Sequence, residues 1–144
     1  MAEDEEAGTD KLEVDNMYLC GSRFTRVSLK GAFFHDSQIQ ETRFEDVNAT
    51  GLTFENVNLS DTKYHDVNMA GTHISYANLT GIVFDDCNMT GEQITNVNLT
   101  GCNLSNVNLT GAAISNANLD GMTINGVLVA DMMALWEKTH GANA

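Results

Sequence analysis

The side chains most able to do chemistry are acidic residues that recur every twenty positions. Asp46, Asp66 and Asp86 form one such series, and Glu45 and Asp85 belong to the series one residue earlier. Regularly spaced carboxylates can bind a basic protein surface or a hard cation. They can also form a salt-bridged face with a basic series of the same spacing: Arg23, Arg43 and Lys63. These three interpretations stay open, and the five acidic residues, called the acidic wall, are the candidate partner-binding site.

Four histidines are the other candidates for chemistry. His65 belongs to the series of Glu45 and Asp85, and His35 belongs to that of Glu55. The pairwise spacings of the histidines are not typical of metal ligands, and no nucleophile is placed beside a base. We therefore expect no catalytic residue and no cofactor, and we assign no metal ligands.

The net charge of the chain restricts its partners. Its 144 residues include 20 acidic and 7 basic ones, which gives a formal charge of −13. Phosphate binding requires lysine and arginine, so neither nucleic acid nor an anionic membrane is an expected partner. A protein partner fits this charge, and a basic one would fit it best.

Targeting and redox signals favour a cytoplasmic protein. The N-terminus, MAEDEE, has the wrong charge for a secretory signal, and no apolar run approaches the ~18 residues of a membrane span. The cysteines Cys20, Cys87 and Cys102 have no CxxC spacing, and an odd number cannot all pair within one chain. We expect them to be reduced packing residues.

A five-residue period determines which elements must position these side chains. From Val14 to Val129 every fifth residue is apolar, 24 positions in all, and these residues are called the centres. A step of five residues turns by about 140° in an α-helix and changes sides in a strand, so neither element would gather the centres on one face. The chain must instead turn a corner after each short extended piece.

Two further positions repeat with this period. The residue two before each centre is small or apolar except at Glu92, which we expect to lean outward or to lie at a local distortion, because a buried unpaired carboxylate is costly. The residue two after each centre is most often Gly or Asn, which suits a corner with positive φ. Exceptions such as Asp46 and Tyr76 predict corners of another turn type.

The repeated unit resembles the A-(D/N)-L-x-x consensus of the pentapeptide-repeat proteins. Residues 77–81, ANLTG, and residues 117–121, ANLDG, match it directly, and the Val-Asn-Leu units match it with Val for Ala. The resemblance covers residues 12–129. It implies an all-β fold, a right-handed quadrilateral parallel β-helix of about six coils with four pentapeptides in each. Residues 1–11 are expected to be a disordered acidic tail, and residues 130–144 a helix and tail.

In such a coil, residues twenty apart would stack in ladders. Inward aromatic ladders are expected on two opposite walls: Phe24, Phe44, Tyr64 and Phe84 on one, and Phe34 and Phe54 on the other. Outward asparagine ladders are expected to hydrogen-bond from coil to coil: Asn48, Asn68, Asn88 and Asn108, and Asn58, Asn78, Asn98 and Asn118. Phe33, an outward aromatic residue, could anchor a partner.

The segment ADMMALWEKTHG near the C-terminus predicts a short capping α-helix. Asp131 can serve as its N-cap, and Gly141 can end it. Its apolar residues would cover the last coil or, as in gyrase-binding relatives, form a homodimer contact: Met132, Met133, Leu135 and Trp136.

Two functions follow. The uniform core and the lack of a predicted pocket favour a non-catalytic scaffold for protein–protein interaction. The alternative, implied by the resemblance, is a DNA-mimicking binder of DNA gyrase related to fluoroquinolone resistance. Residues 14–129 include 12 acidic and five basic residues, whereas ~30 Å of duplex DNA carries about 17 negative charges. The mimicry would therefore be partial.

Overall fold

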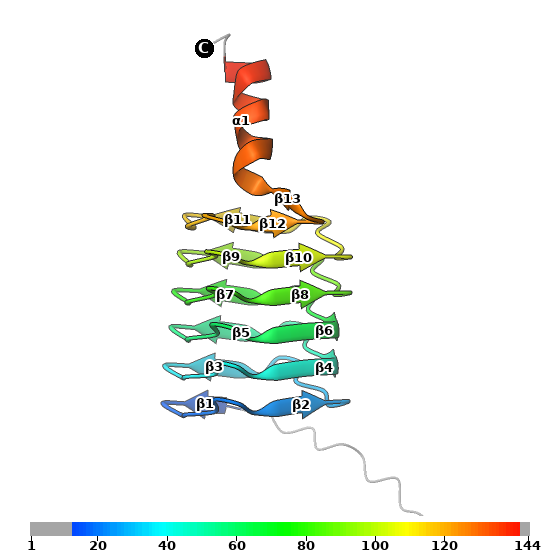
Figure 1. The fold of residues 1–144 in the computed structure, drawn as a ribbon. Coiled ribbons are helices and arrows are strands. Elements are labelled where there is room, and N and C mark those ends of the chain that lie inside the picture. The colour runs from blue at the N-terminus through cyan, green and yellow to red at the C-terminus, as the bar shows by residue number, and fades with distance from the viewer. Residues whose placement is uncertain (1–12, 142–144) are drawn as a thin grey trace, which may run out of the picture.

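The computed structural model describes residues 13–141, which form a rod of stacked coils with a helix at one end (Figure 1). One wall is a six-stranded sheet in the order β1 (Glu13–Asp15), β3 (Phe33–His35), β5 (Thr53–Glu55), β7 (His73–Ser75), β9 (Gln93–Thr95) and β11 (Ala113–Ser115). A second wall is a seven-stranded sheet in the order β2 (Arg23–Thr25), β4 (Arg43–Asn48), β6 (Lys63–Asn68), β8 (Val83–Asp85), β10 (Asn103–Ser105), β12 (Thr123–Ile124) and β13 (Val127–Leu128).

Strand pairing repeats every twenty residues. Phe34 pairs with Phe54 in one sheet and Phe44 with Tyr64 in the other, and both pairs are parallel. Isolated bridges at the same interval, such as that between Asn58 and Asn78, connect the remaining sides of the coils. The predicted all-β fold, a parallel β-helix of about six four-sided coils, is therefore confirmed.

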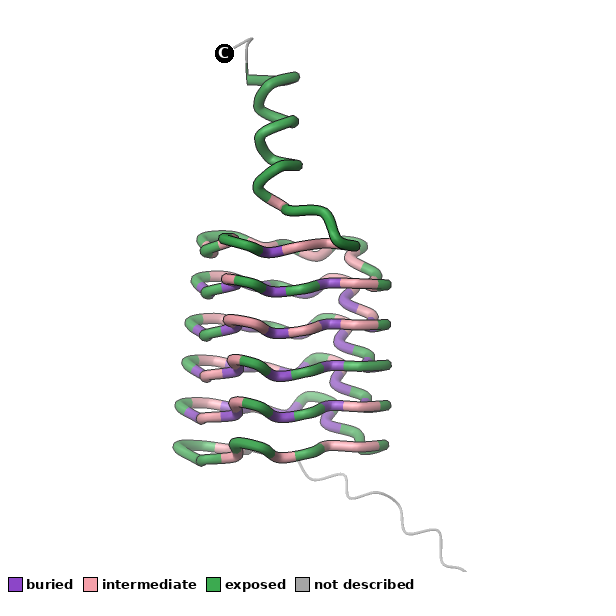
Figure 2. The backbone as a smooth tube through the Cα atoms, viewed as in Figure 1, coloured by how far each residue is buried: buried purple, intermediate pink, exposed green. Residues whose placement is uncertain are grey.

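Buried positions recur along every side of the middle coils (Figure 2). All centres from Leu29 to Leu104 are buried, whereas those of the end coils are half-buried. Stacked rings lie 4.5–5.1 Å apart between centroids along Phe24, Phe44, Tyr64 and Phe84, and 5.1 Å apart between Phe34 and Phe54. This confirms the two aromatic ladders, in which each stacked pair contributes about 0.5–1.5 kcal/mol beyond its buried area.

The corners all use positive φ, including those without glycine. At Gly71 (φ 69°) a hydrogen bond of 3.0 Å from Thr72 N–H to Met69 O closes the turn. Asp46 has φ 53° and Tyr76 has φ 51°, close to the 54° of Asn56. At Tyr76 the chain forms a bend without such a hydrogen bond, whereas Gly71 lies in a hydrogen-bonded turn. The exceptions therefore do lie at a second kind of corner, as predicted, and they share it with asparagine corners such as Asn56.

The asparagine ladders act mainly within single corners. Asn48 Oδ1 accepts hydrogen bonds from the backbone N–H (3.2 Å) and the hydroxyl (2.6 Å) of Thr50. Four other Asn-x-Thr units do the same, at Asn78, Asn88, Asn98 and Asn108. The expected bond between coils is formed from Asn88 Nδ2 to Asn68 Oδ1 (3.3 Å). Most of the asparagine side chains thus stabilise turns, because the i+2 donors are closer than the next coil.

Glu92 departs most from the predicted core. Its side chain is completely buried, and neither carboxylate oxygen has a hydrogen-bond partner among residues 13–141, so the expectation that it leans outward is wrong. Its backbone shows no interruption, since Ala113 N–H donates to Glu92 O at 2.8 Å. Burial raises the pKa of this carboxyl well above its usual value, which favours the neutral form.

Two of the three cysteines agree with the packing role that the sequence predicted, and the exposed Cys20 does not. Cys87 and Cys102 are buried, Cys20 is exposed, and all three are free thiols. Burial raises the pKa of Cys87 to about 11 and that of Cys102 to about 12. Both buried thiols therefore stay protonated and unreactive at neutral pH.

The C-terminal end differs from the prediction. Helix α1 (Val129–His140) begins two residues before Asp131, so Asp131 is not its N-cap but lies in the first turn, and Gly141 ends the helix in right-handed conformation. No side chain of α1 is buried, and the helix extends away from the last coil rather than covering it (Figure 1). Strand β13 instead pairs antiparallel with β12 and covers that edge of the sheet.

None of the helices within residues 13–141 is long and apolar enough to cross a membrane. The predicted acidic tail, residues 1–11, lies outside the described residues.

Candidate partner-binding groove

An open groove of about 960 Å³ runs along the rod beside one part of the acidic wall. Asp46, Asp66 and Asp86 form one edge, and an asparagine ladder forms the other. Its floor includes Val47 and Val67, which are buried. The groove spans the coils from Arg26 to Asn106, a length of about 19 Å at the usual strand spacing.

The three groove aspartates have no ion-pair or side-chain hydrogen-bond partner among the described residues 13–141, and all are exposed. Their positive φ at each corner (52–54°) places them at the same point of successive coils. Like charges at about 4.8 Å repel one another, so the row does not stabilise the fold. Unpaired carboxylates along a groove are instead suited to a cationic partner.

The other two residues of the acidic wall, Glu45 and Asp85, do have partners. Glu45 lies 3.3 Å from Arg43 and 3.7 Å from Arg23, which confirms a salt-bridged face at this position. Asp85 accepts a hydrogen bond from Ser105 Oγ (3.0 Å) and lies 3.2 Å from His65 Nδ1, and the Ser105 bond is the main cause that lowers the pKa of Asp85. The structure therefore divides the acidic wall into paired and unpaired carboxylates.

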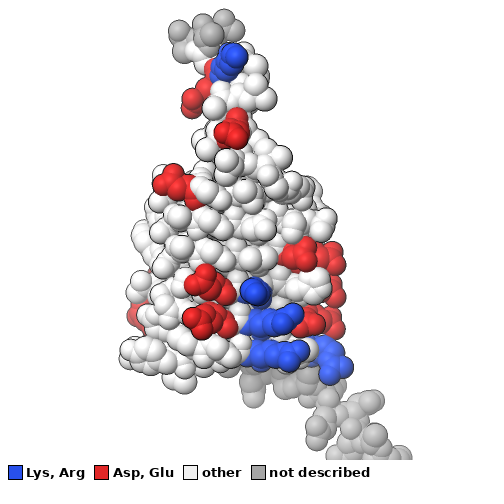
Figure 3. All heavy atoms as spheres, viewed as in Figure 1, with Lys and Arg blue, Asp and Glu red and all other residues white. Residues whose placement is uncertain are grey.

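Charge is unevenly distributed over the rod. On the face seen in Figure 3, basic side chains gather over β2, β4 and β6, between two acidic groups, and the later coils carry few charges. Within the groove, Asp46, Asp66 and Asp86 carry negative charge, whereas Arg26 in the first coil is positive.

The apolar residues of α1 form the second predicted site. Leu135 and Trp136 are 63% and 61% exposed, and Met132 and Met133 are 39% and 50% exposed. The last two coils are also incompletely covered, since Leu109 and Leu119 are only half-buried. This end of the rod thus exposes an apolar surface that residues 13–141 leave uncovered.

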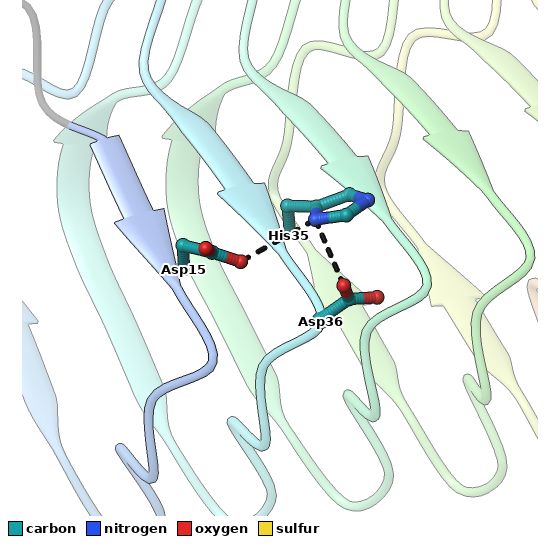
Figure 4. A group of neighbouring side chains, drawn as sticks. All are labelled: Asp15, His35 and Asp36. Atoms are coloured by element: carbon teal, nitrogen blue, oxygen red, sulfur yellow. Dashed lines mark hydrogen bonds and ion pairs between the residues drawn. The ribbon is translucent and has the colours of Figure 1, made fainter.

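Sequence reasoning missed one constellation at the other end of the rod. Asp15 and Asp36 both approach His35 Nδ1 (Figure 4). The signal was present, because Asp15 precedes His35 by twenty residues and Asp36 follows it directly. Phe33, expected to be an exposed anchor, is half-buried and stacks on the His35 ring.

Comparison with known proteins gives a consistent result. The chain matches the family model "Pentapeptide repeat region" over residues 18–94 and the model "Pentapeptide repeats (8 copies)" over residues 93–128. The comparison with curated proteins found no match.

Solved structures resemble this chain in fold. A pentapeptide repeat protein, Rfr23, from the cyanobacterium Cyanothece 51142 is 17% identical, with a TM-score of 0.74 over 78% of this chain and 91% of that chain. One from the Arabidopsis thaliana thylakoid lumen is 19% identical, with a TM-score of 0.54 over 85% and 76%. The plasmid-mediated fluoroquinolone resistance protein QnrB1 is 11% identical over 89% and 99%, and its TM-score of 0.36 carries no argument about function.

The five-residue period, the stacked four-sided coils and the family models that together span residues 18–128 lead to one assignment. The chain belongs to the pentapeptide-repeat family.

Proposed function

We propose that this protein is a non-catalytic scaffold that binds a basic segment of a partner protein along the groove. The unpaired row of Asp46, Asp66 and Asp86 at the groove edge is the observation that supports this proposal. A packed solenoid holds such a row at fixed spacing, so the binding surface requires little ordering when a partner arrives.

The groove suits an extended or helical segment better than a small molecule. It is open along its length of about 19 Å, which corresponds to roughly six residues of extended chain. The asparagine edge offers side-chain amides as hydrogen-bond donors and acceptors, although several Oδ1 atoms already accept bonds from their own corners. The carboxylates would provide most of the affinity for the partner segment, and the amides would fix its register along the groove.

Charge reversal in the groove tests this proposal. The triple variant D46K/D66K/D86K should abolish binding of a short fluorescent peptide of alternating lysine and glycine, as measured by anisotropy at low salt. Wild-type binding should weaken as salt is added, because the contact is electrostatic. Affinity capture from the native cell with the same variants would then identify the partner.

The matched control reverses three acids outside the groove: E41K/D61K/D120K. It changes the net charge by the same amount, so a general attraction between an acidic protein and a basic peptide predicts equal losses in the two variants. That result would contradict the proposal, as would a neutral peptide that binds equally well.

A DNA-mimicking binder of DNA gyrase is the second hypothesis. The groove row presents one carboxylate about every 4.8 Å, whereas duplex DNA presents one charge about every 1.7 Å. The charge density along the row therefore favours a protein segment as the partner over the DNA-binding surface of a topoisomerase.

A further inference from the structure

Three ligand atoms converge where the first two coils meet. His35 Nδ1 lies 3.5 Å from Asp15 Oδ1 and 3.0 Å from Asp36 Oδ2, and the three atoms all lie within 4.8 Å of one another. Asp15 comes from β1, His35 ends β3, and Asp36 is the corner residue that follows β3 (Figure 4).

The side chains of His35 and Asp36 are held in place by their neighbours. The Phe33 ring stacks on the His35 imidazole at 5.6 Å between centroids, with an interplanar angle of 13°. Asn56 Nδ2 donates a hydrogen bond to Asp36 Oδ1, which leaves Asp36 Oδ2 turned toward the imidazole. Outer contacts of this kind fix the orientation of ligands in metal sites.

A neutral imidazole can satisfy only part of this convergence by hydrogen bonding. A single imidazole Nδ1 carries at most one hydrogen, yet carboxylates from two residues approach it. The two carboxylates also repel each other. A cation among the three atoms would satisfy both carboxylates and the nitrogen at once.

We propose that Asp15, His35 and Asp36 bind a divalent transition-metal ion of the Zn²⁺ class and so link the first coil to the second. Tetrahedral Zn²⁺ with bonds of about 2.0–2.1 Å separates its ligand atoms by about 3.3 Å, and the two observed separations from Nδ1 lie on either side of that value. A nitrogen ligand favours Zn²⁺ or Co²⁺ over Ca²⁺ and Mg²⁺. Asp15 and Asp36 are exposed and His35 is half-buried, so water can take the remaining position.

The opposite wall supplies a matched control. His65 lies in register between Glu45 and Asp85, as His35 lies between Asp15 and Glu55. Glu45, however, pairs with arginines, and Asp85 is the partner that approaches His65 Nδ1 (3.2 Å). His65 therefore has similar sequence surroundings without a third converging ligand, and it should not bind the ion.

The test uses the full chain after treatment with a chelator. Titration with Co²⁺, followed by visible absorption, and with Zn²⁺, followed by calorimetry, should give one ion per chain. His35→Gln should weaken binding by more than the roughly 10- to 100-fold that the loss of an outer contact costs, and Asn56→Ala should weaken it within that range. His65→Gln should leave affinity unchanged, and excess Ca²⁺ should not compete.

NMR of the imidazole groups gives a second readout, because Zn²⁺ should shift the His35 resonances and leave those of His65 in place. Circular dichroism of each variant would confirm that it is folded. The proposal is overturned if the wild-type protein binds no Zn²⁺ at submillimolar concentration, or if His35→Gln and His65→Gln lose binding equally. Undiminished binding in His35→Gln would place the ion elsewhere and also reject the site.

Discussion

At the scale of single residues, Glu92 is a destabilising group inside a well-packed core. It is completely buried and has no hydrogen-bond partner in the part of the chain that the structure describes. The titratable groups that interact with it, Tyr64, Cys87 and Cys102, are themselves buried. The same series holds Leu52 and Thr72 in the two preceding coils, and Thr72 Oγ1 donates to Ala49 O at 3.0 Å. An apolar side chain, or a hydroxyl that can donate to a backbone carbonyl, is therefore well accommodated at this buried position, whereas a carboxyl is not.

The buried carboxyl predicts an unusual dependence of stability on pH. Because the pKa of Glu92 is raised in the folded chain, the folded protein keeps a proton that the unfolded chain releases above its ordinary pKa. The contribution of Glu92 to the free energy of unfolding is thus greatest at acid pH and falls as pH rises toward the folded pKa, by at most about 1.4 kcal/mol per pH unit. Glu92→Leu, which introduces the residue type found at position 52 of the same series, should remove this loss of stability with rising pH.

Urea unfolding across the pH range measures the effect. The gain in stability from Glu92→Leu should be small near the ordinary glutamate pKa and should increase toward neutral pH. Glu55→Leu removes a carboxyl from an outward, half-buried position and should keep the wild-type pH dependence. If Glu92→Leu and the wild-type protein lost stability in parallel as pH rises, the carboxyl would not be held neutral in the core.

At the scale of elements, α1 contributes little to the stability of the rod but exposes its apolar side chains. It has no buried residue, and β13 rather than α1 pairs with the last parallel strand. An isolated helix of this length is marginal in water and needs packing to persist. We therefore propose that a second copy of the chain covers α1 and the half-buried last coil, as a homodimer.

Substitution on α1 tests the homodimer. Leu135→Ser with Trp136→Ser should convert a dimer to a monomer in sedimentation equilibrium, with little change in the unfolding of the coils. Both side chains are largely exposed, and the Trp136 ring stacks on His140 of the same helix rather than on a coil. Thr139→Ser, on the same helix, keeps its hydroxyl bonding capacity and should leave the dimer intact. A wild-type protein that sediments as a monomer at high concentration would reject the dimer.

At the scale of the whole molecule, the charge of the rod lies mainly on its first four coils. A DNA mimic would need acidic charge along its whole length at a much higher density. We expect the purified protein neither to inhibit gyrase supercoiling nor to protect gyrase from a fluoroquinolone. Inhibition at micromolar protein that is lost in D46K/D66K/D86K would instead support the gyrase hypothesis and assign the groove to it.

The sequence determined the architecture of this protein because every pentapeptide repeats the same pattern of inward and corner residues. An apolar centre, a small residue two positions before it and a corner residue two positions after it define one side of a coil, and the period of twenty follows from four sides. The buried centres and the stacked aromatic rings were predictable for this reason. Residues twenty apart could be placed beside one another from the sequence, and Asp15 and His35 were among them.

Only the tertiary structure decided what the side chains do once they are neighbours. Glu45 pairs with arginines, Asp85 with Ser105 and His65, and Asp66 with none of the described residues, although all three belong to the predicted acidic wall. Glu92 is buried because coils on both sides fix its backbone. The five-residue period specifies where each Cα lies, but side-chain torsions and the packing of α1 depend on atoms from other coils that no local pattern encodes.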